Sequence, residues 1–203
     1  MKLFYSPGDC SLSPHIALRE SALPFELVKV DLKTKLTANG SEFMLLNPKG
    51  SVPLLQLGSG EYLTEGPAIL QYVADQVPTR HLAPAQGTIE RYRLMESLNY
   101  ISTELHKGFA PLFKTDSTDE VRQSAIVRLQ DRFGLIAPQL GKNDYLFGAH
   151  FTVADAYLFV MLRWATHCEV DLGRWESFGA FHARVGARPA VREALLAEGL
   201  VKG

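Results

Sequence analysis

Cysteine is scarce in this sequence of 203 residues, which contains two cysteines, Cys10 and Cys168. Two thiols cannot build the framework of several disulfides that stabilises small secreted domains. The scarcity excludes a disulfide-stapled scaffold and predicts a protein of a reducing compartment, the cytoplasm. It also leaves only two candidates for thiol chemistry, so each can be weighed by its own surroundings.

An excess of charge is also missing, because 21 lysines and arginines face 22 aspartates and glutamates. Proteins that bind nucleic acid or anionic membranes usually carry a basic patch, and the sequence contains none. It also lacks an apolar run of about 18 residues that could span a bilayer. The N-terminal MKLFYSPGDC becomes polar too early for a secretory signal peptide. The composition, with 46% hydrophobic residues, predicts a globular protein without a nucleic-acid or membrane partner.

Proline divides the chain, since seven of the eleven prolines precede residue 81. In that part, short apolar runs predict strands and the segments between some of them predict helices, an alternation typical of an α/β domain. The expected strands are 2–5, 25–30, 52–57 and 61–63, and the expected helices are about 12–21 and 66–76.

From residue 88 onward, apolar residues recur every three or four positions, which predicts long helices. The expected helices are about 88–113, 117–140 and one that begins at 152, followed by two shorter ones. The predicted organisation is therefore an α/β domain at 1–80, a linker at 81–87 and an all-α domain at 88–203.

Cys10 lies between a Pro-Gly-Asp turn and the first turn of a predicted helix, which Ser11 or Ser13 could cap. Amides at a helix N-terminus stabilise an anion, so this position favours a partial thiolate, the reactive form of cysteine. The alternative is a small buried side chain without a chemical role. Ser13 stands where a Cys-x-x-Cys motif has its second thiol, which leaves exchange with an external thiol as the only disulfide chemistry.

Two backbone features could bind a peptide-like ligand. The Val52-Pro53 bond opens a strand and is a candidate for the cis form, in which the Val52 amide and carbonyl would be free to pair with a ligand. The alternative is an ordinary trans proline. Glu65 and Gly66 precede an apolar helix whose first amides could hold a carboxylate, while Glu65 could receive an ammonium group. The alternative is a plain acidic helix start.

Asn99, Thr103, His106 and Lys107 form one polar stripe on the long predicted helix. A solvated helix face explains such a stripe without any function. His106 is its only side chain that exchanges protons near neutral pH, which makes it a candidate acid or base. Thr152 and Asp155 fit a capping box at the start of a later helix, a structural role. No spacing of histidine, cysteine and aspartate predicts a metal site.

Taken in order, these segments resemble the glutathione transferases, and the bacterial beta class most closely. The resemblance spans essentially the whole chain. It implies a thioredoxin-like N-terminal domain, an all-helical C-terminal domain and a homodimer. Its strongest stretches are MKLFYSPGDCSLSPHIALRE, NPKGSVPLLQL, LTEGPAILQYVAD, LNYISTELHKGFAPLF and FTVADAYLF.

The resemblance also implies roles for residues. Cys10 would lie at the glutathione sulfur and His106 would assist catalysis, while the Thr152–Asp155 box matches a folding cap of the family. Many relatives have serine where this chain has Gly66, so the γ-glutamyl carboxylate would rely on backbone amides. Tyr5 or Ser11 could assist Cys10. The implied glutathione-binding residues are Lys35, Val52, Pro53, Glu65, Gly66, Asn99, Thr103, Glu104 and Lys107.

The expected function is the conjugation of glutathione, a cosubstrate, to hydrophobic electrophiles without a metal. Thiol–disulfide exchange or reductive dehalogenation through Cys10 are alternatives that use the same site. A non-catalytic interaction module of the same fold is a third possibility, which the presence of Cys10, Glu65 and the polar stripe disfavours. The electrophile pocket is expected to be lined by Tyr5, Phe109, Phe113, Trp164 and His167.

Overall fold

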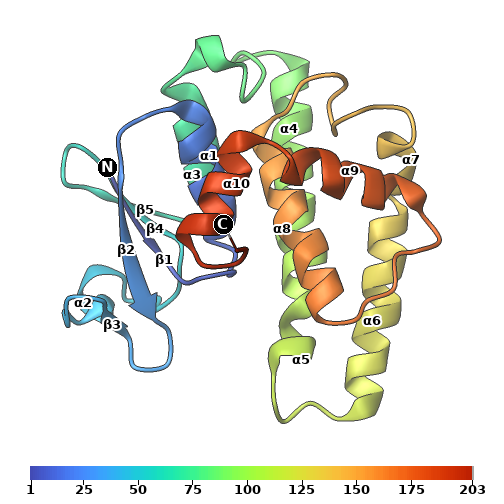
Figure 1. The fold of residues 1–203 in the computed structure, drawn as a ribbon, viewed down its shortest axis with the longest axis horizontal. Helices are drawn as coiled ribbons and strands as arrows, with labels where there is room; N and C mark the ends of the chain where they lie inside the picture. The colour runs from blue at the N-terminus through green and yellow to red at the C-terminus, as the bar shows by residue number, and fades with distance from the viewer. Residues whose placement is uncertain (203) are drawn as a thin grey trace. The chain divides into compact units, whose positions relative to one another are not determined.

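The computed structural model describes residues 1–202, which divide into two compact units (Figure 1). The first unit comprises Met1–Ala83 and the residues from Arg188 onward, and the second comprises Pro84–Ala187. The sequence pattern predicts one helical domain over 88–203. In the structure, however, α10 (Pro189–Ala197) packs against α1 (Leu12–Ser21) and groups with the first unit.

A mixed sheet of five strands, in the order β3-β2-β1-β4-β5, forms the centre of the first unit. β1 and β2 are parallel, and the other neighbours are antiparallel. This sheet and its helices have the thioredoxin-like arrangement that the resemblance implies. The strands are β1 (Lys2–Tyr5), β2 (Glu26–Asp31), β3 (Leu36–Thr37), β4 (Leu54–Gln56) and β5 (Tyr62–Thr64).

Both faces of the central strand β1 are buried. Successive residues of a strand point to opposite faces, so Leu3 and Phe4 of β1 face different sides, and both are buried. Phe4 packs against Phe43 of α2 (Phe43–Leu46), with ring centroids 5.8 Å apart. α1 packs against α3 (Gly66–Asp75), which is followed by the short 3₁₀ helix η1 (Pro78–Arg80). β3 and α2 fill a stretch in which the sequence predicts no regular element.

Helices make up the second unit among the residues that the structure describes. α8 is its central element, and its side chains from Val153 to Leu162 are all buried. The elements are α4 (Ile89–Tyr100), η2 (Ile101–His106), η3 (Lys107–Phe109), α5 (Ala110–Phe113), α6 (Asp119–Gly134), α7 (Ala137–Leu140), α8 (Val153–His167) and α9 (Glu176–Gly186).

The long helix expected at 88–113 is interrupted. α4 passes into the π-helical segment η2 and then into the 3₁₀ segment η3 before α5 resumes the α-helix. Gly108 allows α6 to come close at this point, because a Cβ there would lie 2.8 Å from a Leu129 methyl carbon. π-helical segments are rare and occur frequently at functional sites, so this interruption marks the segment that carries His106.

Candidate active site

Cys10 lies in the loop between β1 and α1, two residues before the helix begins at Leu12. The loop starts with a turn closed by the Asp9 amide, which donates to the Ser6 carbonyl over 3.1 Å. Gly8 has a φ of +74°, which favours glycine, and its amide donates to Oε2 of Glu198 over 2.8 Å. The loop is therefore held by a hydrogen bond within it and by a second one to Glu198, a residue that follows α10.

Cys10 contacts Val52, the residue before the strand-opening proline. Cys10 Sγ donates a hydrogen bond to the Val52 carbonyl over 3.3 Å, and the Val52-Pro53 peptide bond is cis. The Cys10 residue is 8% exposed and Val52 is buried. Two of the residues singled out in the sequence, which are 42 positions apart, thus share one site.

The expectation of a partial thiolate at Cys10 is wrong. Burial raises the pKa of the Cys10 thiol well above its ordinary value of 9.0, and the neighbouring Asp9 carboxylate raises it further. The backbone amides of Cys10 and Ser11 lower this pKa, as a helix start should, but they act less strongly than burial and Asp9. Near neutral pH, Cys10 is therefore a neutral thiol that donates a hydrogen bond.

The two hydroxyl groups near Cys10 are differently placed. Ser11 occupies the N-cap position of α1 but makes no side-chain cap, because its hydroxyl donates to the Ser6 carbonyl and accepts from the Ser6 amide, each over 3.2 Å. Ser13 donates to the Cys10 carbonyl over 2.8 Å, so it does not cap the helix either. Burial and the charge of Glu198 raise the pKa of Tyr5, which keeps this phenol protonated at neutral pH.

Glu65 adopts an unusual backbone conformation at the start of α3, with a φ of +69°. Its carboxylate binds the Lys49 ammonium over 2.6 Å, and Lys49 also donates to the Thr64 hydroxyl over 2.9 Å. A Cβ at Gly66 would meet no atom within 4 Å, so the space that a serine side chain would use is open. Sequence reasoning missed Lys49, although it lies inside the NPKGSVP stretch.

Lys35 also has a left-handed conformation, with a φ of +59°. Its ammonium group donates to the Gly50 carbonyl over 2.7 Å, which directs the side chain to the loop that precedes Val52. The structure therefore brings the Lys35 side chain to the segment that leads into the Cys10 contact.

His106 lies in the second unit, at the end of η2. Its Nδ1 is 2.6 Å from the hydroxyl of Tyr157, which is buried in α8. The rings of His106 and Trp164 pack edge to face, with their centroids 5.0 Å apart. His106 therefore faces α8 and is half-buried, although the sequence pattern predicts an exposed polar stripe.

The other residues of the polar stripe and the neighbouring Glu104 have different surroundings in the structure. The Thr103 hydroxyl donates to the Asn99 carbonyl over 3.0 Å and stays on the helix surface. Glu104 instead pairs with α6, where its Oε2 lies 2.9 Å from Nε of Arg132 and 3.4 Å from Arg128. Lys107 is exposed. The stripe assumes about 100° per residue, and the π-helical turn breaks that spacing.

Most of the residues expected to line an electrophile pocket do meet within the second unit. Trp164 contacts Phe109 and Phe113, with ring centroids 5.7 Å and 4.9 Å apart. His167 stacks on Phe113. We call Phe109, Phe113, Trp164 and His167 the aromatic cluster. Tyr5, the fifth expected residue, belongs to the first unit.

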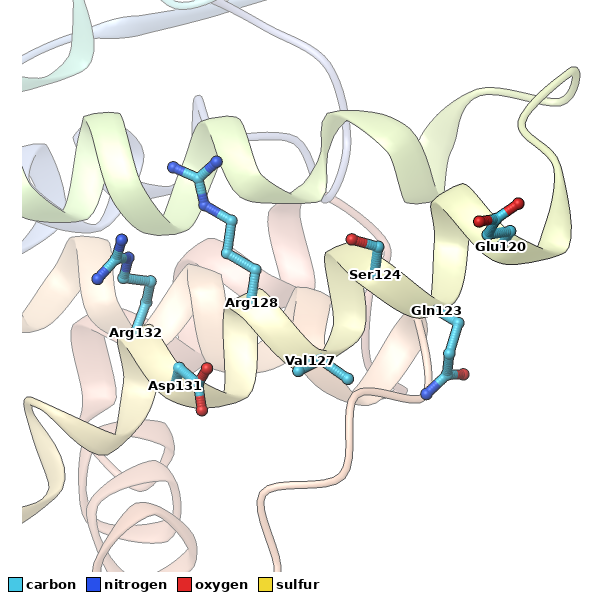
Figure 2. A pocket seen from close by; sticks show the side chains of 7 residues that line it. All are labelled: Glu120, Gln123, Ser124, Val127, Arg128, Asp131 and Arg132. Atoms are coloured by element: carbon cyan, nitrogen blue, oxygen red, sulfur yellow. The ribbon is translucent and has the colours of Figure 1, made fainter.

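A hollow of about 550 Å³ lies along one face of α6. Figure 2 shows Arg128 and Arg132, the partners of Glu104, on this face together with the other side chains that line the hollow. Sequence reasoning did not single it out, and its side chains include no thiol or histidine. Residues 1–202 contain no group of histidine, cysteine and carboxylate side chains that could hold a metal ion. The lining residues are Glu120, Gln123, Ser124, Val127, Arg128, Asp131 and Arg132.

Comparisons with known proteins match both parts of the chain. Residues 9–76 match the glutathione S-transferase N-terminal domain, and residues 119–195 match the C-terminal domain of that family. The chain is 48% identical to glutathione S-transferase GstA of Escherichia coli O157:H7, over 98% of this chain and 100% of the relative. The chain belongs to the glutathione S-transferase family.

Solved structures agree with this assignment. A bacterial beta-class glutathione S-transferase from Sphingomonas chungbukensis is 49% identical, with a TM-score of 0.95 over 99% of this chain and 100% of that one. A sphingomonad glutathione S-transferase complexed with glutathione is 47% identical, with the same TM-score of 0.95 and the same coverage. The resemblance to the beta class and the predicted fold class are therefore confirmed.

The first unit of this glutathione S-transferase thus holds several predicted site residues in mutual contact or on adjoining segments, namely Cys10, Val52, Pro53, Glu65, Gly66 and Lys35. His106, Asn99, Thr103, Glu104 and Lys107 belong to the second unit. Asp9, Lys49 and Glu198 were missed. The charge of Asp9 next to Cys10 was a signal available in the sequence, whereas the contact of Glu198 with Gly8 joins residues 190 positions apart and left none.

Proposed function

We propose that this glutathione S-transferase binds glutathione in its first unit and transfers it to an apolar electrophile. The observation that carries this proposal is the contact between the Cys10 thiol and the Val52 carbonyl, next to the cis peptide bond to Pro53. The sphingomonad relative that was solved with glutathione supports the choice of cosubstrate. Cys10 is the residue proposed to lie at the glutathione sulfur.

Glutathione is a peptide with charged groups at both ends, and the first unit offers a partner for each. The backbone of Val52 would pair with the cysteinyl part, as a sheet edge pairs with a peptide. The amides at the start of α3, from Gly66 onward, would hold the γ-glutamyl carboxylate, and Glu65 would receive the ammonium group. Lys35 would reach the glycyl carboxylate at the other end.

The reaction needs the glutathione thiolate, because the thiolate is the nucleophile. The neutral Cys10 thiol can donate a hydrogen bond to that sulfur and so favour its ionised form. With a chlorinated aromatic electrophile, the carbon–sulfur bond forms, the carbon–chlorine bond breaks and chloride leaves, while the thiol proton passes to water. His106 is the proposed proton donor or hydrogen-bond partner, and Tyr5 and Ser11 are secondary candidates.

The second unit is proposed to receive the electrophile on the aromatic cluster, which offers apolar ring surface to a planar apolar molecule. Phe113 is 46% exposed, so part of this surface is accessible. We further propose a homodimer in the cytoplasm that needs no metal. Asn99, Thr103, Glu104 and Lys107 remain candidates for contacts with glutathione.

Thiol–disulfide exchange is the second candidate function, and the presence of Cys10 at this position favours it. Cys10 would take glutathione from a mixed disulfide and pass it to free glutathione. Ser13 stands in place of a second thiol, so the exchange would use one cysteine of the chain. The raised pKa of Cys10 argues against exchange as the main activity, because little thiolate is present near neutral pH.

Retention on immobilised glutathione, followed by a conjugation assay with a chlorinated dinitrobenzene, tests the proposal. We expect retention and conjugation in the unmodified protein. In Cys10→Ala, exchange should vanish while conjugation persists at a reduced rate, since the substitution removes a donor and not the nucleophile. A protein that neither binds the resin nor conjugates would refute the proposed function.

A further inference from the structure

Asp9 places a carboxylate directly beside the thiol of Cys10. Its Oδ1 accepts a hydrogen bond from the Cys10 amide over 2.7 Å, and the side chain is half-buried. The Asp9 backbone is fixed as well, because its amide donates to Ser6 and its carbonyl accepts from Leu12 over 2.9 Å. The negative charge is thus held near the thiol by both the backbone and the side chain.

This charge is not neutralised, since Asp9 forms no ion pair within residues 1–202. Tyr5, at the end of β1, stays uncharged at neutral pH. Several other charged side chains of the first unit have partners: Arg19 pairs with Glu193, Glu20 with Arg188, and Lys49 with Glu65. Glu198 adds a second carboxylate at this loop, because it accepts the Gly8 amide. Among the described residues, Asp9 is therefore a carboxylate next to Cys10 that has no ion-pair partner.

An uncompensated carboxylate next to a thiol disfavours the thiolate, because a second negative charge would have to form beside the first. Burial acts in this direction on Cys10, and Coulomb repulsion from Asp9 adds to it. The protonated thiol then has its hydrogen available for an acceptor such as the Val52 carbonyl.

We propose that Asp9 is a positioning residue that restrains the nucleophilic chemistry of Cys10. Together with burial, its carboxylate favours Cys10 as a hydrogen-bond donor, and removing that charge speeds the capture of glutathione by Cys10. The capture step starts from glutathione disulfide: the Cys10 thiolate attacks one sulfur, a Cys10–glutathione disulfide forms, and the original disulfide breaks. The second glutathione leaves as a thiolate and takes a proton from water. This inference rests on the proposed function only in the capture step, in which glutathione is the ligand.

Asp9→Asn is the decisive variant, because asparagine keeps the Oδ1 acceptor for the Cys10 amide and removes the charge. A Cys168→Ser background leaves Cys10 as the only thiol of the chain. Thiolate absorbance near 240 nm, followed against pH without glutathione, reports the ionisation of Cys10. Glu26→Gln is the matched control, since Glu26 pairs with Lys2 at the opposite end of β1 from Cys10.

We expect the midpoint of the thiolate titration to fall by about one pH unit in Asp9→Asn and to stay unchanged in Glu26→Gln. At pH 7 the mixed disulfide with glutathione disulfide, measured by mass spectrometry, should form about threefold faster in Asp9→Asn, because a tenfold gain in thiolate is partly offset by its lower nucleophilicity. If the asparagine variant does not fold, Asp9→Ser replaces it, and we expect the same changes in the midpoint and in the rate. An unchanged or raised midpoint in a folded variant would overturn the proposal. Because the titration contains no glutathione, failed retention on the glutathione resin would count against the proposed function alone.

Discussion

The Oε1 of Glu198 lies 2.8 Å from Nδ1 of His15, and neither side chain has any exposed surface. The other ring nitrogen of His15 accepts from Nε of Arg19 over 3.4 Å, so Nδ1 carries the proton that Glu198 accepts. The second oxygen of Glu198 accepts the Gly8 amide. One carboxylate thus joins the C-terminal segment, α1 and the loop that carries Cys10.

Glu198→Ala should strongly destabilise the protein, because it removes the carboxylate that accepts from the buried His15 ring and from the Gly8 amide. We expect the free energy of unfolding to fall by about 2–4 kcal/mol, because each buried polar group that loses its partner costs about 1–3 kcal/mol. Urea denaturation measures this change. Glu193→Ala in α10 is the control, since its pair with Arg19 is exposed and should contribute less than about 1 kcal/mol. Equal losses in the two variants would contradict this account.

Asp155 should make stability depend on pH. Its carboxylate caps α8 by accepting from the amide and hydroxyl of Thr152 and also accepts from the Leu146 amide. Burial raises the pKa of Asp155 from 3.8 to about 6 despite these bonds. Between these two values the folded protein binds more protons at Asp155 than the unfolded chain does, so the contribution of Asp155 to stability is largest below pH 4 and is lost as the pH rises through 6.

Asp155→Asn does not titrate and therefore isolates this contribution. Relative to the variant, the unmodified protein should lose roughly 2 kcal/mol of unfolding free energy between pH 4 and pH 7. Denaturant unfolding of both proteins at the two pH values measures the difference. A difference that is the same at pH 4 and pH 7 would show that Asp155 does not titrate in this range.

The Tyr157 hydroxyl should act on catalysis through His106, whose ring it holds by a hydrogen bond to Nδ1. Tyr157→Phe removes about 1 kcal/mol of interaction, which should lower kcat about fivefold and leave the KM for glutathione unchanged. In a His106→Ala background the same substitution should have no further effect on kcat. Tyr100→Phe is the control, because its hydroxyl donates to the Arg132 carbonyl instead. A full effect of Tyr157→Phe without His106 would refute the coupling.

Lys49 should compete with the ammonium group of glutathione for Glu65. The pair is exposed, with side chains 54% and 67% accessible, so it is worth at most about 1 kcal/mol. Lys49→Gln should therefore improve glutathione affinity by up to about fivefold at low salt, while Glu65→Gln should weaken it about tenfold. Calorimetric titration measures both, with Lys2→Gln as a control. Weaker binding in Lys49→Gln would instead make Lys49 a ligand of glutathione.

The larger elements of the fold follow from local patterns in the sequence. Short apolar runs, and the alternation in FELVKV, predict β1, β2, β4 and β5 within a residue or two, and β1 and β4 are the strands that bury most of their residues. β3 has two residues and α2 has four, which is too short for either period to be recognised. The π-helical segment η2 is invisible for another reason. Its buried residues Ile101 and Leu105 keep a spacing that an α-helix would also give.

The site was less predictable than the fold because its chemistry depends on contacts between distant residues. The position of Cys10 before a helix predicts a thiolate only if burial and the Asp9 charge are ignored. The partners of Glu65 and His106 are Lys49 and Tyr157, which no local pattern links to them. A carboxylate at position 198 carries no sign that it reaches Gly8.

Because α10 and Glu198 belong to the first unit, the two segments of that unit are separated in the chain by the entire second unit. During synthesis, the β-strands and α1 emerge early, but the carboxylate that binds the Gly8 amide emerges only after α9. The loop that carries Cys10 therefore reaches its final form after nearly all of the chain has left the ribosome. An enzyme built in this way acquires its reactive loop last, when the surrounding structure is already able to fold.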